Sequence, residues 1–131
     1  GGARGRPFLM TLNELYRQTL ERMQVAADGE PARPEDIKTV RERYAVVFEL
    51  LNAKGLADWD AEDDIPPDAG FGVSLVMAAY CAEDFFVPEP RKSSLKAEGY
   101  LDLPQPSLAE RMLIKRNSAK YLSQPAQPEY F

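Results

Sequence analysis

The residues best suited to chemistry are six acidic side chains between Asp58 and Asp68, a stretch that contains no basic residue. Carboxylates this close together could bind a cation, and the Glu62–Asp63 pair could supply the two carboxyl groups of a glycoside hydrolase. A calcium loop that began at Asp58 would need glycine at its sixth position and glutamate at its twelfth, where this chain has Asp63 and Ala69. We therefore prefer a solvated loop that leads into a helix, with Trp59 covering the core.

Other groups that usually perform catalysis are scarce. The 131-residue chain has no histidine, the side chain that most often serves as a general base near neutral pH. Its single cysteine, Cys81, lies in a long apolar segment, and we expect a small core residue because nothing nearby would lower the thiol pKa. Internal disulfides and Cys/His metal sites are excluded, and no phosphate-binding glycine motif occurs. We predict no enzymatic activity, no cofactor and no metal.

Charge and hydropathy narrow the possible partners. A net charge of −5 argues against nucleic acid wrapping the whole surface, although Lys115, Arg116 and Lys120 beside Tyr121 could form a local patch. The same residues also describe the polar face of an amphipathic helix. No apolar run approaches the roughly 20 residues that a membrane span needs, so we expect a single soluble domain.

The apolar residues recur at helical spacing along most of the chain. Thr11 and Glu14 form a capping box that predicts a helix over 12–25, and Pro34 suits the first turn of a second helix over 34–53. A third helix over 71–87 is apolar on nearly every face, which indicates the centre of a bundle and a subunit contact as well.

The C-terminal third is predicted to be less regular. Residues 91–99 could hold one or two helical turns, and residues 100–103 form an extended packing segment. Ser107 and Glu110 form a second capping box, which predicts a last helix over 108–122. Its basic face and the acidic stretch could attract each other between neighbouring copies. The predicted fold class is all-α, a small bundle of three to four helices with an extended C-terminal arm.

The arm is the segment Ser123–Phe131, which follows the last helix. Pro125 and Pro128 prevent a helix or a central strand from running through it, yet it contains Tyr130 and Phe131, which are costly to leave in water. A frayed terminus is the alternative to a docking arm. We divide the chain into three parts: a flexible basic leader over 1–10, a helical domain over 11–103, and the C-terminal helix with its docking arm over 104–131.

The order of four features resembles a known family. They are a first helix ending at Val25–Asp28, a second closed by Gly55-Leu56, an acidic Asp63–Pro67 start to an alanine-rich apolar helix, and a basic helix leading to an extended tail. Over residues 11–131 this order is similar to the head-to-tail adaptors of short-tailed phages, also called tail accessory factors or packaged-DNA stabilisation proteins. The chain departs from the family in a shorter C-terminal part and in the proline-containing stretch 88–106.

The resemblance implies a virion protein, present in the host cytoplasm during assembly, that binds the portal ring after DNA packaging, closes the head and offers a platform to tail proteins. It implies a ring of twelve copies, with packaged DNA nearby but not specifically bound. It places portal docking on the end of the last helix and on the arm: Arg116, Lys120, Tyr121, Leu122, Gln124, Pro125, Pro128, Tyr130 and Phe131. The alternatives are a head-completion protein of a long-tailed phage, a small helical nucleic-acid-binding regulator and a carboxylate-dependent hydrolase.

Overall fold

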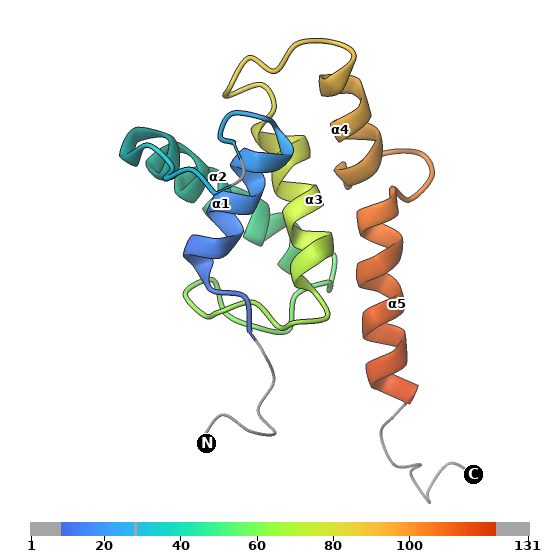
Figure 1. The fold of residues 1–131 in the computed structure, drawn as a ribbon. Coiled ribbons are helices and arrows are strands. Elements are labelled where there is room, and N and C mark those ends of the chain that lie inside the picture. Colours follow the sequence, from blue (N-terminus) through green and yellow to red (C-terminus); the bar gives the residue numbers. More distant parts are fainter. Residues whose placement is uncertain (1–8, 28, 123–131) are drawn as a thin grey trace, which may run out of the picture.

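The chain folds into an all-α bundle (Figure 1). The computed structural model describes residues 9–27 and 29–122, so the segment 123–131 predicted as an arm lies outside it. The all-α prediction is confirmed. The described part has five helices, one more than the upper end of the expected three to four, because residues 91–99 form a complete helix. The helices are α1 (Leu12–Arg22), α2 (Pro34–Ala53), α3 (Gly70–Cys81), α4 (Arg91–Gly99) and α5 (Leu108–Leu122).

The central element is α3, which packs against each of the other four helices. Ten of its twelve residues are buried, among them Val73, Val76 and Met77, which have no exposed surface. This agrees with the prediction of a bundle centre. Since the chain's own helices cover α3, its apolar character alone requires no subunit contact.

Two helices have the predicted bounds, 34–53 and 108–122, and the capping box at the start of α1 is confirmed. The Glu14 N–H donates to the Thr11 hydroxyl over 3.1 Å, and the Thr11 N–H donates to the Glu14 carboxylate over 2.8 Å. The bond from the Thr11 N–H, and after it the interaction with the Thr11 hydroxyl, hold the pKa of the Glu14 carboxyl below its usual value. The second capping box forms only in part: the Glu110 N–H donates to the Ser107 hydroxyl over 3.2 Å, while the Glu110 carboxylate binds Lys54.

Two helices end earlier than predicted, each at a turn with a left-handed residue. After α1, Gln24 has a φ of 62°, and the 12–25 helix stops at Arg22. After α3, Phe86 has a φ of 52°, and the 71–87 helix stops at Cys81. The end of α2 uses the same turn with Gly55 at φ 71°, the residue type that adopts this conformation without strain. Helical periodicity alone does not reveal turns in which another residue replaces glycine.

The helical body begins before residue 11. Met10, assigned by sequence to the leader, exchanges two backbone hydrogen bonds with Ile65 across an isolated bridge, at 3.0 and 2.8 Å. This pairing ties the chain before α1 to the loop before α3. None of the helices in the described ranges has the length and hydropathy that crossing a membrane requires.

The C-terminal helix belongs to the same packed body as the other four. On α5, Ala109 and Leu113 are buried, and α5 contacts α3 and α4 at the edge of the bundle (Figure 1). Gly72 on α3 provides room for this contact, since an added Cβ would lie 3.2 Å from Cγ of Leu113. The boundary placed by sequence at residue 104 therefore does not separate two independently packed parts.

Candidate partner-binding surface

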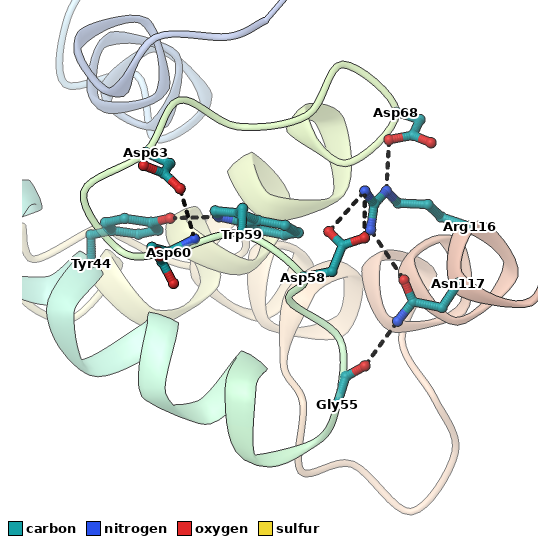
Figure 2. Close-up of polar contacts among 9 residues, drawn as sticks. All are labelled: Tyr44, Gly55, Asp58, Trp59, Asp60, Asp63, Asp68, Arg116 and Asn117. Atoms are coloured by element: carbon teal, nitrogen blue, oxygen red, sulfur yellow. Dashed lines mark hydrogen bonds and ion pairs between the residues drawn. The ribbon is translucent and has the colours of Figure 1, made fainter. Parts of the chain in front are cut away.

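The predicted docking residues start on α5, and Arg116 fixes where that helix lies. The Arg116 Nε donates to Asp68 over 2.6 Å, and its Nη2 donates to Asp58 over 3.0 Å (Figure 2). Its guanidinium carbon lies 5.5 Å from the ring centroid of Trp59. Only 7% of the Arg116 side chain is exposed.

The acidic loop can hold Arg116 because Trp59 anchors the loop in the core. The Trp59 indole N–H donates to the Tyr44 hydroxyl over 3.2 Å, and its ring meets Phe48 edge-on at a centroid distance of 6.4 Å. Burial raises the pKa of Tyr44, an effect that the bond from Trp59 partly opposes. Trp59 is 9% exposed, so the prediction that it covers the core is confirmed. One aromatic thus links the core of the bundle to the loop that receives α5.

Hydrogen bonds on both sides of Trp59 complete this arrangement. The Asp60 N–H donates to the Asp63 carboxylate over 3.2 Å, which closes the turn that follows Trp59 (Figure 2). On α5, the Asn117 amide donates to the carbonyl of Gly55 over 2.9 Å and accepts a bond from Arg116 over 3.1 Å. The middle of α5 is therefore bound to the end of α2 as well as to the acidic loop.

A second ion pair holds the first turn of α5. The Lys54 ammonium lies 3.2 Å from the Glu110 carboxylate, whose residue is 8% exposed. Glu110 and Arg116 are six residues apart, about 9 Å along a helix axis. With Leu113 packed between them, α5 is fixed at two levels.

The charge attraction proposed from the sequence is present, but it acts within one chain. Asp58 and Asp68 pair with Arg116 of the same molecule, whereas the sequence suggested attraction between neighbouring copies. Burial lowers the pKa of the guanidinium, but the bonds to the two carboxylates outweigh that effect and the pKa is raised. Arg116 is therefore a positioning residue for α5, with its charge already neutralised.

The other predicted docking residues follow Arg116 along the chain. Lys120, Tyr121 and Leu122 form the end of α5. The remaining predicted contacts lie outside the described residues: Gln124, Pro125, Pro128, Tyr130 and Phe131. Sequence reasoning missed Ile114 on α5 and Leu103 before it, which are 43% and 36% exposed. It placed Leu108 on the apolar stripe of the helix, but this side chain is 41% exposed. For Ile114, the signal in the sequence was an apolar residue between positions that carry the basic face of this helix.

Two features considered for chemistry, the acidic stretch and Cys81, lie in the described ranges. No cluster of three or more His, Cys, Asp or Glu side chains there is arranged to hold a metal ion. Cys81 is fully buried, as expected of a core residue, and burial raises the pKa of its thiol to about 12. Among the described side chains, the acidic stretch has a structural use, which is to bind α5.

Sequence reasoning also missed Phe86, the most exposed of the large apolar side chains described, at 89%. It had been placed inside the third helix. Pro88 indicates only that Val87, the residue before it, leaves the helical conformation, so the left-handed turn at Phe86 had no local signal.

Comparison of this chain with protein-family models, with curated proteins and with solved structures gives no match. Function is therefore inferred from the geometry of this chain and from the order of features in its sequence.

Proposed function

We propose that the chain is a phage structural adaptor that joins a portal ring to a tail and acts by binding. The observation that carries this proposal is the two-level attachment of α5, through Glu110 in its first turn and Arg116 further along. A helix held in this way presents its C-terminal end and the segment after it from a fixed starting point. The resemblance of residues 11–131 to head-to-tail adaptors supplies the identity of the partner.

The fixed helix would reduce the cost of docking. Ordering a segment costs about 1–2 kcal/mol of backbone entropy per residue, which burial of Tyr130 and Phe131 in the portal must exceed. Because α5 is already in place, docking does not have to order that helix as well. Repetition of this contact around a ring would turn weak individual contacts into a durable joint.

Deletion of residues 123–131 tests the proposal. The shortened chain should keep its far-ultraviolet circular dichroism and melting temperature, because the described core lies entirely before residue 123. It should lose binding to the portal ring encoded in the same genome, measured by co-sedimentation and by imaging of the mixed particles. The matched control removes residues 1–8 and should bind like the full chain. A full-length chain that does not bind the portal, or a shortened one that still does, would refute the proposal.

Binding to nucleic acid is less well supported than portal binding. Arg116 was the centre of the predicted basic patch, and its charge is committed to Asp58 and Asp68. A DNA-binding regulator would show an affinity for duplex DNA that falls steeply with salt. We expect no such affinity at moderate salt.

A further inference from the structure

Phe86 occupies a position where its side chain works against folding. It is the left-handed residue of the turn that ends the α3 segment: its N–H donates to the carbonyl of Glu83 over 3.2 Å, and the Val87 N–H donates to that of Ala82 over 3.0 Å. Glycine is favoured at this position because it has no Cβ, and the equivalent turn after α2 has Gly55 there. Phe86 therefore carries backbone strain and also exposes an aromatic ring. A strained, exposed aromatic calls for a role outside the folded monomer.

The backbone on both sides of Phe86 is fixed. Val87 is 4% exposed and belongs to the hydrophobic core, and Phe85 packs against the same core. Asp84 makes a two-point ion pair with Arg43 of α2, both distances being 2.9 Å. The backbone that carries the exposed ring is thus fixed on both sides, so burial of the ring in a partner would cost little ordering entropy.

We propose that Phe86 inserts into a pocket on a second copy of this chain, which we call the Arg22 pocket. It lies between α1 and the start of α3, has a volume of about 440 Å³ and is lined by Gln18, Glu21, Arg22 and Phe71. The Arg22 guanidinium lies 4.6 Å from the ring centroid of Phe71, which is 49% exposed. An entering aromatic ring would meet one ring and one cation, both of which form favourable contacts with it.

Charge complementarity favours this pocket over two others. The segment 83–89 that carries Phe86 has three carboxylates and no basic residue. Asp84 pairs with Arg43 and Glu83 with Lys96, so Glu89, which makes no salt bridge in the described ranges, is the carboxylate that could approach a cation on another copy. Within the described ranges Arg22 makes no salt bridge, and its Nε donates to the Ser74 hydroxyl over 2.7 Å. Burial also lowers the pKa of Arg22, an effect that an approaching carboxylate would oppose. A second hollow is lined by Glu42 and by the Arg43–Asp84 pair, and a third belongs to the 88–94 segment next to Phe86 itself.

The contact joins copies without involving the C-terminal segment. It supplies the lateral contact that a ring of adaptors needs, and to that extent it rests on the proposed function. The pairwise contact itself can be measured with the chain alone.

The experiment measures self-association of the full chain by sedimentation velocity and native mass spectrometry. The wild type should associate as its concentration rises into the micromolar range. Phe86→Gly should weaken association by roughly 30-fold or more, the loss typical of a buried aromatic anchor. It should not lower the melting temperature, because glycine suits a φ of 52°. Phe71→Ala, which removes the aromatic wall of the pocket, should weaken association equally. Val46→Ala, a change at an apolar residue that is 49% exposed on α2, should leave association unchanged and serves as the control.

A mixing experiment tests the pairing directly. Phe86→Gly retains the pocket and Phe71→Ala retains the anchor, so an equimolar mixture should form a mixed dimer at concentrations at which each variant alone is monomeric. A wild-type chain that stays monomeric, a Phe86→Gly variant that associates like the wild type, or a mixture that stays monomeric would each overturn the contact. If a monomeric wild type still binds the portal, the contact fails and the proposed function stands. If the wild type associates as expected but does not bind the portal, the proposed function fails and the contact between copies stands.

Discussion

Replacing Arg116 by methionine should loosen α5 while leaving the rest of the bundle folded. Methionine keeps an unbranched stem that can still pack on Trp59, but it removes the bonds to Asp58 and Asp68. Hydrogen bonds to charged groups contribute about 1.5–3 kcal/mol, and exposed ion pairs contribute about 0–1 kcal/mol. Asp68 is 66% exposed and belongs to the second class, whereas Asp58, at 31%, is better shielded. The lost cation–π contact adds about 0.5–1 kcal/mol. Together these contributions predict that the free energy of unfolding falls by about 2–5 kcal/mol.

The matched control is Arg33→Met. Arg33 pairs with Glu35 over the same short distance, 2.6 Å, but the two side chains are 70% and 64% exposed. Because solvent screens this pair, the control should leave the denaturation midpoint unchanged. The comparison separates burial from distance as the cause of the stabilisation.

Urea denaturation followed by circular dichroism and by Trp59 fluorescence measures the loss, and hydrogen exchange locates it. Amides in the second half of α5 should exchange faster in Arg116→Met. The exchange of α3 amides should quicken only by the amount that the fall in global stability accounts for. A double-mutant cycle with Asp58→Asn should give a coupling energy of about 1 kcal/mol. The reasoning is refuted if Arg116→Met shifts the midpoint no more than Arg33→Met does, or if α5 exchange is unchanged.

Further outcomes follow from two glycines and the single cysteine of the core. Gly99→Ala should cost more than about 3 kcal/mol in urea denaturation, because the added Cβ would lie within overlap distance of the carbonyl oxygen of Leu75, a backbone atom that cannot move aside. Gly72→Ala should cost about 1 kcal/mol, since its nearest neighbour, at 3.2 Å, is the movable side chain of Leu113; equal losses would contradict this reasoning. The Cys81 thiol, with its pKa raised to about 12, should resist thiol reagents in the folded protein at pH 8 and react once urea unfolds it. In the unfolded chain this thiol ionises from about pH 8.5, so the stability that its burial contributes is complete below that pH and is lost as the pH rises toward 12; a Cys81→Ala variant should lack this part of the alkaline decline.

A helix boundary could be predicted from the sequence where a specific residue, such as a proline or a capping pair, marked it in addition to the apolar spacing. Pro34 marked the start of α2, and the Thr11–Glu14 capping box marked that of α1. The ends of α1 and α3 were placed too late because Gln24 and Phe86 adopt the left-handed conformation that usually requires glycine. Tertiary packing holds Val87 in the core after the second of these turns, and a local pattern contains no information on that contact.

The candidate surface was predictable in composition but not in pairing. The sequence identified the acidic stretch and the basic last helix as complementary, and it named Arg116. Whether two such segments meet within one chain or between copies depends on the path of the backbone between them. Here the short helix α4, packed tightly on α3 through Gly99, returns the chain so that α5 reaches the acidic loop of its own molecule.

This internal pairing changes what each part of the chain can contribute to assembly. With Arg116 neutralised by Asp58 and Asp68, its side chain is committed to holding α5, and the contact proposed between copies uses residues without such ion pairing. Phe86 and the half-buried Arg22 are such residues in the described ranges: one is an aromatic that its own chain does not cover, the other a cation without a salt bridge. Because neither residue lies on α5, the contact proposed between copies and the docking proposed for the residues after α5 use different parts of the chain.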